Sequence, residues 1–478
     1  MNEPAFEPET RPVPLTAFER RFKHPPGLVI LFFAEMWERF SYYGMRGLLK
    51  LYMANYLFVS AREALQGCRQ QTPPCPLVPG DPSSVFLWES IRGLLPNNPQ
   101  EAASILYGAY TAFAYFTPFF GGIIADRWLG QRRTVVVGGS LMALGHFVMA
   151  IESSFFIALF LLILGNGAFK PNVSTQVGSL YAPGDPRRDG AYTIFYMGIN
   201  LGAFICNLVC GTLAALYGWH YGFAAAGVGM VLGLIVYIAG QKYLAVDQLE
   251  RRRSGNATEP PGPLSRTERR SVIALCALCA LNVVFWAVYE QQGNTMQTWA
   301  DEKTIWPQVF GFQIPSTWYQ SVNPLAIIVL APFLDLWWRR QARRGTEPTS
   351  VTKMALGCML LGGSFVLMIL GAQVIGDGKG SLFWPVACTV LLTIGELYLS
   401  PVGLSLVTKV SPARIVSMMM GVWFLSSFLG NFLSGAIGVL YTRWSSEAFF
   451  TLLTLLGVGA GVAMLAFNRP LRAAIETR

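Results

Sequence analysis

Residues 27–58 read GLVILFFAEMWERFSYYGMRGLLKLYMANYLF, a stretch with the length and flanks of a membrane span that nevertheless carries charges at its centre. A helix of about 20 apolar residues crosses a bilayer. A charged group at membrane depth costs about 3 kcal/mol on insertion scales, and it persists when it is paired or lines a water-filled path. The stretch therefore predicts a membrane-spanning helix with one polar side.

The charged and tyrosine side chains of this helix share that side. At about 100° per residue, six of them fall within an arc of about 140°: Glu35, Glu38, Arg39, Tyr42, Tyr43 and Arg46. Apolar residues, Phe40 and Leu48 among them, lie opposite. A structural salt-bridge ladder from Glu35 to Arg39 would account for two of the charges, but it requires neither Arg46 nor the tyrosines. We therefore favour a polar wall that faces a cavity.

The rest of the chain repeats the apolar pattern. Of its 478 residues, 53% are hydrophobic and only 13% are charged, about half the charged fraction of a soluble protein. This composition indicates an all-α membrane protein that crosses the bilayer many times. Apolar length predicts about twelve spans, at 27–58, 101–125, 134–151, 155–180, 190–216, 219–244, 271–297, 315–338, 351–373, 382–408, 413–441 and 447–468.

A hydrophilic, arginine-rich linker divides these spans into two halves of six, the general layout of many secondary transporters. The predicted segments are a terminal segment 1–26, a first bundle 27–244, a linker 245–270, a second bundle 271–468 and a terminal tail 469–478. Basic residues follow every even-numbered span, whereas the odd-numbered exits are nearly neutral. By the positive-inside rule, both termini and the linker are expected in the cytoplasm. The first segment lacks a signal-peptide pattern.

The net charge of +9 is explained by these loops, so it does not indicate nucleic-acid binding. Six of the eight cysteines lie in apolar runs and are expected to be buried thiols. Cys68 and Cys75 share a polar loop that this topology places outside, where a disulfide bond and two free thiols both remain open.

Three further ionisable residues lie inside predicted spans. Lys170 precedes Pro171, which leaves a backbone carbonyl unpaired, and a lysine there is expected to need a carboxylate partner. Glu290 and Glu396 are single acids in spans of the second half. Each is either a satisfied structural acid or a group that takes up a proton from one side and releases it to the other. Charges in both halves together favour a central polar cavity.

These motifs resemble those of the proton-dependent oligopeptide transporters, a family of the major facilitator superfamily. EMWERFSYYG is similar to the family's E-x-x-E-R motif on the first helix. GGIIADRWLGQRRT, residues 121–134, is similar to the signature after the second helix, and FLLILGNGAFKPNVSTQVG, residues 160–178, to that of the fourth. The resemblance covers the transmembrane core and implies the superfamily's twelve-helix fold. The linker is too short for the two extra helices of many bacterial members, so we expect none.

The resemblance also implies roles for single residues. Proton coupling and salt bridges are expected of Glu35, Glu38, Arg39, Arg46, Lys170 and Glu290. Arg46 would hold the peptide carboxylate, Glu290 would be its protonatable partner, and Glu396 would receive the peptide amino terminus. The other expected peptide-binding residues are Tyr42, Tyr43, Tyr115, Lys170, Asn200, Trp286, Asn323 and Trp423. Asp126 and Arg127 resemble the superfamily's cytoplasmic gate motif, although a topology signal with a helix cap would explain them as well.

The implied function is import of di- and tripeptides with protons across a bacterial inner membrane by alternating access. The expected partners are the peptide, protons and the lipid bilayer, with the protein working as a monomer. We expect no cofactor apart from the proton gradient, no metal and no nucleic acid. An alternative keeps the fold and changes the cargo to nitrate or a peptide-like drug. An enzyme or a channel is disfavoured, because the sequence has no His-rich metal cluster, nucleophile elbow or P-loop.

Overall fold

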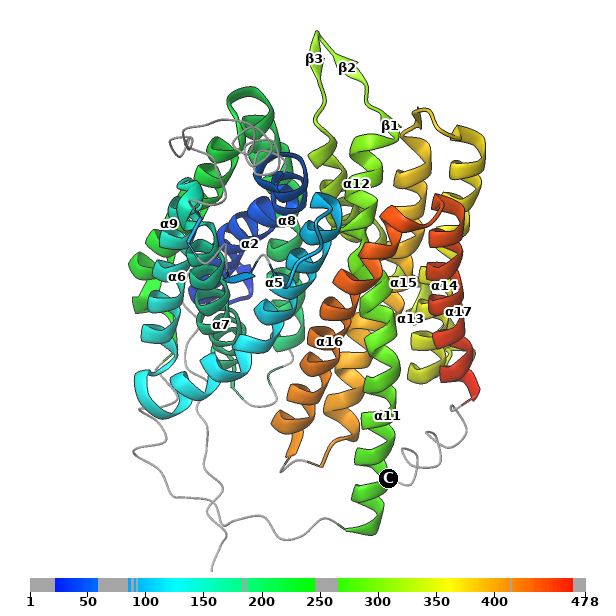
Figure 1. Cartoon of the computed structure of the whole chain (residues 1–478). Coiled ribbons are helices and arrows are strands. Elements are labelled where there is room, and N and C mark those ends of the chain that lie inside the picture. The colour runs from blue at the N-terminus through cyan, green and yellow to red at the C-terminus, as the bar shows by residue number, and fades with distance from the viewer. Residues whose placement is uncertain are drawn as a thin grey trace, which may run out of the picture.

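The computed structural model describes residues 22–58, 85–86, 90–91, 93–182, 185, 187–245, 265–412 and 415–466. The chain forms two helical bundles that lie side by side (Figure 1). The helices of the first bundle are α2 (Pro26–Tyr52), α5 (Pro99–Ile124), α6 (Gln131–Val148), α7 (Phe155–Ser179), α8 (Arg187–Tyr217) and α9 (Trp219–Gly240). Those of the second are α11 (Arg266–Tyr289), α12 (Thr295–Glu302), α13 (Val322–Arg343), α14 (Ser350–Ile375), α15 (Phe383–Val410), α16 (Val416–Arg443) and α17 (Ser446–Ala466).

These helices match the twelve predicted spans one to one, with α11 and α12 together forming the seventh. Within the described residues, nine spans are apolar enough to be recognised by composition alone. The other three are α2, α5 and α6. Charges lower the hydropathy of α2, tyrosines and glycines that of α5, and two arginines that of the short α6.

Short elements connect the helices. The 3-10 helices are η4 (Glu152–Ser154), η5 (Gln241–Tyr243), η6 (Glu290–Gln292) and η7 (Ser316–Ser321), and the π-helical turns are η1 (Met53–Leu57) and η3 (Ala125–Leu129). Strands β2 (Gln308–Val309) and β3 (Phe312–Gln313) form an antiparallel hairpin, and β1 (Thr304–Ile305) pairs in parallel with β4 (Gly380–Ser381). The hairpin projects from one end of the molecule, and α11 begins at the opposite end (Figure 1). We call these ends the hairpin face and the linker face.

Local sequence sets where several helices begin. Pro26 and Pro99 each occupy the first turn of a helix, where a missing backbone N–H costs nothing. The side chain of Asn98 accepts a hydrogen bond from the backbone of Gln100 at 2.9 Å and caps α5. Ser265 and Glu268 form a reciprocal capping box at the start of α11. The helix ends are therefore encoded locally, independently of the membrane.

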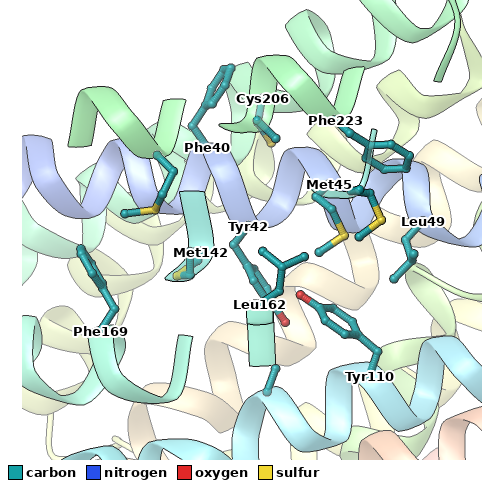
Figure 2. Packing of buried hydrophobic residues seen from close by; sticks show 14 of the residues in the cluster. Phe40, Tyr42, Met45, Leu49, Tyr110, Met142, Leu162, Phe169, Cys206 and Phe223 are labelled. Carbon is teal, nitrogen blue, oxygen red and sulfur yellow. The ribbon is translucent and has the colours of Figure 1, made fainter. Parts of the chain in front are cut away.

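Each bundle has a hydrophobic core of its own. In the first core, Phe40, Met45, Phe169, Cys206 and Phe223 converge from four helices (Figure 2). Phe40 fills the space beside Gly229, where an added Cβ would lie 2.4 Å from the ring. The side of α2 that the sequence marks as apolar thus packs on α8 and α9, which leaves its polar side for the second bundle.

The bundles join most closely between α5 and α16. A Cβ on Gly108 would lie 2.6 Å from the Cα of Gly435, so the two backbones touch. Near the hairpin face, Arg443 of α16 pairs with Glu101 of α5 at 2.6 Å, and Asn55 of the first bundle donates to Asp301 of the second at 3.1 Å. These contacts bridge the two bundles at the hairpin face.

Two predicted boundaries are corrected. The seventh span is not continuous, because α11 ends at Tyr289 and α12 begins only at Thr295. The predicted start of the eighth span at 315 is confirmed, because the 3-10 helix Ser316–Ser321 leads into α13 and the two form one apolar span, Ser316–Arg343. The second bundle begins at Arg266, where the capping box starts a helix five residues before the predicted 271. Cys68, Cys75 and residues 246–264 of the linker lie outside the described residues.

The glycine contact between α5 and α16 leads to a first prediction. A valine at Gly108 would force the two backbones apart, and overpacking of this kind costs about 1–3 kcal/mol. We expect Gly108→Val to open the hairpin face, seen as longer spin-label distances between positions 151 and 383, which are both exposed there. Gly363→Val is the control, because no atom lies within 4 Å of an added Cβ at that helical glycine. Equal distances in the two variants would contradict the prediction.

Candidate functional site

A cavity of about 300 Å³ lies between the two bundles. Helices α2, α5, α7 and α8 contribute to it from the first bundle, and α11, α13, α15 and α16 from the second. Twelve of the residues predicted from the sequence line this cavity: Glu35, Arg39, Tyr43, Arg46, Tyr115, Lys170, Asn200, Trp286, Glu290, Asn323, Glu396 and Trp423. The two halves of the chain thus build one polar chamber.

An ion pair between Arg46 and Glu290 connects the bundles at this cavity. Nη2 of Arg46 on α2 donates to Oε2 of Glu290, which is 1% exposed. Nε of Arg46 donates to the hydroxyl of Tyr107 on α5 at 2.8 Å. Two of the guanidinium's nitrogens are therefore fixed, one by each bundle. Such charge-assisted bonds in a site sheltered from water are strong and directional.

Glu290 lies where the seventh span is interrupted. It is the first residue of the 3-10 helix that follows α11, and Gly293 and Asn294 separate that turn from α12. Irregular backbone at membrane depth is tolerated where protein surrounds it or where it lines a cavity. Here one missing bond is supplied by the side chain of Gln320, which donates to the carbonyl of Gln292 at 3.2 Å, and the side chain of Gln291 fastens the segment to α16 by donating to the carbonyl of Ser434 at 2.9 Å.

A second charged cluster lies deeper along α2. Nε of Arg39 lies 3.0 Å from Glu35 and 2.5 Å from Glu38, and all three side chains are buried. Lys170 of α7 was expected to pair with one of these acids. Instead its Nζ lies 4.4 Å from the ring centroid of Tyr115, and no carboxylate of the described residues is within 4.0 Å of it. The expected ion pair is absent from this conformation.

The second bundle contributes an acid held by neutral groups. The side-chain amide of Asn323 donates to Glu396 and to the hydroxyl of Thr393, each at 2.9 Å. The two tryptophans of this wall, Trp286 and Trp423, each pack against a glycine. A Cβ at Gly430 would lie 2.4 Å from Trp286, and one at Gly403 would lie 2.2 Å from Trp423. The wall thus combines an acid that has no cationic partner in the described structure with flat apolar rings.

Two residues from the predicted site do not line the cavity. Tyr42 is buried against Tyr110 of α5, with ring centroids 6.4 Å apart (Figure 2). Glu38 is 0% exposed behind Arg39. Asp126 and Arg127 lie far from the cavity, exposed in the π-helical turn η3 at the linker end of α5. Their position agrees with a gate motif at the linker face and equally with a helix cap.

Several cavity residues were missed by the sequence reasoning: Tyr196, Tyr289, Gln292 and Gln320, together with Tyr107, which holds Arg46. The run EQQGNTMQT, residues 290–298, carried a usable signal. It places seven polar residues and one glycine in a predicted span, and such density at membrane depth indicates either a cavity or a helix break.

Comparisons with known proteins agree with this architecture. A family model described as the POT family matches residues 132–252 and 264–452. The "Peptide transporter YePEPT" of Yersinia enterocolitica is 34% identical over 87% of this chain and 88% of its own length. A "Di-/tripeptide transporter" of Lactococcus lactis subsp. cremoris is 30% identical over 94% of this chain and 96% of its own. The crystal structure of a mutant peptide transporter POT in complex with alafosfalin, 32% identical, superposes with a TM-score of 0.78 over 97% of this chain and 98% of that chain.

The hydrogen bond to Tyr107 supports a second prediction. Tyr107→Phe would leave Nε of Arg46 buried without its partner, which costs about 1–3 kcal/mol, so we expect a lower midpoint of thermal unfolding in detergent. Tyr110→Phe is the matched control: Tyr110 is equally buried, and its hydroxyl makes no hydrogen bond with the described residues. If both variants unfold at the wild-type temperature, Tyr107 does not hold the arginine.

Proposed function

The chain belongs to the POT family, and on this basis we propose that it transports di- and tripeptides together with protons. The relatives named as peptide transporters span nearly its full length, which supports a shared cargo. The observation that carries the proposal is the Arg46–Glu290 pair, because it joins the two bundles at the cavity where a substrate would bind.

The charges around the cavity favour a proton as the coupled ion. Four carboxylates belong to this group, Glu35, Glu38, Glu290 and Glu396, against three cations, Arg39, Arg46 and Lys170. The group therefore carries one formal negative charge in excess. A buried excess charge is costly, and uptake of one proton by a carboxylate removes it. Our hypothesis is that Glu290 takes this proton, because its protonation would release Arg46.

The free arginine would then bind the peptide carboxylate. At the other end, Glu396 would accept the peptide's amino group, since its present hydrogen-bond partner, Asn323, is neutral. Trp286 and Trp423 offer apolar surfaces that tolerate different side chains. A volume of about 300 Å³ lies at the lower end of small-molecule pockets, which suits a short peptide. Lys170, Glu35, Glu38 and Arg39 would couple protonation to gating within the first bundle.

We propose that the linker face lies in the cytoplasm of a bacterial cell and that the protein resides in its inner membrane. Described arginines concentrate at that face, including Arg127, Arg132 and Arg188, whereas Glu101, Asp301 and Glu302 lie at the hairpin face; the positive-inside rule then sets the orientation. With the hairpin face closed, the conformation would be the cytoplasm-facing one. Transport would follow from rocking of the two bundles about the cavity, by a single chain in the bilayer with no cofactor beyond the proton gradient.

Replacement of Glu290 tests the coupling. Glu290→Gln keeps the shape of the side chain but removes its titration. We expect a pH gradient to drive little or no dipeptide uptake into proteoliposomes, at least tenfold less than in the wild type, whereas dipeptide counterflow without a gradient continues. Glu447→Gln, the same change near the hairpin end of α17, is the control. Gradient-driven uptake by Glu290→Gln would show that another group carries the proton.

Competition distinguishes peptide from nitrate as cargo. The cavity holds both an arginine, Arg46, and an acid without a cationic partner among the described residues, Glu396. We therefore expect unlabelled dipeptides and peptide-like compounds to inhibit uptake of a labelled dipeptide. A tenfold higher concentration of nitrate should leave that uptake unchanged. Inhibition by nitrate at concentrations comparable to the dipeptide would favour the anion instead.

A further inference from the structure

A second cavity, of about 700 Å³, continues from the central one toward the linker face. Tyr115, Lys170, Ser174, Leu404 and Phe424 line both cavities, so the two are contiguous. From there the second cavity follows α7 and the first turns of α8. The central cavity, whose wall holds Arg46 and Glu290, adjoins its inner end, and exposed residues of the linker face lie at its outer end. Its position makes it the path on which a substrate would leave the central cavity.

Among the described residues, the two charged ones that line this second cavity are both cations, Lys170 at the inner end and Arg188 at the outer end. Arg188 packs against α7 at Gly178, where an added Cβ would lie 3.0 Å from Nη2 of the arginine and 2.6 Å from the hydroxyl of Tyr192. Gly178 is eight residues after Lys170, about 12 Å along the helix axis. The two cations thus stand about two turns of α7 apart.

Neither cation forms an ion pair with a described residue, and Glu35 and Glu38 act on Lys170 only over a longer distance. Among the residues that the structure places, no carboxylate lies within 4.0 Å of Nζ of Lys170 or of the guanidinium of Arg188. The guanidinium lies 6.0 Å from the ring centroid of Tyr192 instead. The neighbouring Arg187 differs: it pairs with Asp185 at 2.7 Å and does not line the cavity. Arg188 also lies in the first turn of the 31-residue helix α8, whose positive end favours an anion.

The second cavity also has hydrogen-bond acceptors and an apolar wall that could bind the other parts of a peptide. The hydroxyls of Ser174 and Thr175 donate to the carbonyls of Lys170 and Pro171, at 3.1 and 2.8 Å. Their hydrogens are thereby used, and their oxygens remain as acceptors for N–H groups. The facing wall, from α15 and α16, is apolar, with Leu404, Met420 and Phe424. The cavity therefore matches a molecule with a carboxylate, an amide N–H and an apolar side chain.

We propose that this second cavity is an exit site, which binds the carboxylate of a departing peptide between Lys170 and Arg188. The proposal rests on the proposed function, since it assigns the same cargo to a second position. A carboxylate that leaves Arg46 would otherwise lose its cationic partner before it reaches the linker face, and a series of cations along the path lowers that barrier. An exit site between the central cavity and the linker face changes the rate of peptide release and the rate of rebinding from this face by the same factor. It leaves the equilibrium affinity of the central cavity unchanged.

The test compares three variants in proteoliposomes of phosphatidylcholine alone: Arg188→Gln, Arg188→Lys and Arg187→Gln. We expect Arg188→Gln to slow exchange of labelled alanyl-alanine about two- to fivefold, the range of a partly exposed ion pair, with the Kd of the purified protein for the same dipeptide unchanged. Arg188→Lys should restore most of the rate because it restores the charge. Arg187→Gln should exchange like the wild type.

Two results would overturn the exit site alone. Wild-type exchange by Arg188→Gln would show that the charge has no part in release, and a change in Kd that matches the change in rate would assign Arg188 to the central site. A repeat in vesicles that contain phosphatidylglycerol addresses the other source of an anion. If the Arg188→Gln defect appears only in those vesicles, the cavity binds a lipid headgroup and the proposal is wrong. A wild-type protein that exchanges no dipeptide would instead contradict the proposed function itself.

Discussion

An arginine at membrane depth needs polar partners, and Arg46 finds a carboxylate on the opposite bundle. This requirement organises the centre of the molecule. The bundles have separate hydrophobic cores, so side chains between them must be matched pair by pair. Glu290 supplies the charge, and Tyr107 supplies the second hydrogen bond. The position of Tyr107 also requires a glycine at residue 293, because a Cβ there would lie 1.9 Å from the hydroxyl of Tyr107.

The broken seventh span follows from the same requirement. A continuous helix would have kept the backbone of residues 290–294 in regular i to i−4 bonds. The break places Glu290 beside α2 and releases backbone groups that the protein must then satisfy. Gln320 of η7 does this for the carbonyl of Gln292, to which its side-chain amide donates at 3.2 Å, and the same amide donates to the side chain of Gln297 on α12 at 2.9 Å. The hydrogen bonds that the backbone loses at the break are thus offset by a polar network that joins α12 to its neighbours near the hairpin face.

The sequence predicted the helices and most of the residues that line the cavity. It did not predict the features that depend on how a neighbouring helix packs. Apolar length located twelve spans because lipid imposes that length on each one separately. The wheel of α2 correctly grouped its polar residues, yet only the part of the arc from Glu35 through Arg46 to Tyr43 faces the cavity. Tyr42 and Glu38 lie on the other flank of that arc, where α5 packs. A helical wheel holds no information on which flank the next helix covers. Tyr107 was missed for the same reason, since its role depends on the approach of α5 to Arg46.

Under the proposed function, coupling between a proton and a peptide would arise from competition for one guanidinium. Tyr107 occupies Nε of Arg46, and Glu290 occupies Nη2, so a peptide carboxylate cannot take the same bidentate position while Glu290 is charged. A proton on Glu290 would remove the competitor, and it would also remove the attraction between the bundles at that point. The substrate would then replace a bond between the bundles by bonds to itself. Binding and gating would be two results of this one exchange of partners if Arg46 keeps a fixed orientation. The buried hydroxyl of Tyr107 fixes that orientation from within the first bundle, independently of Glu290.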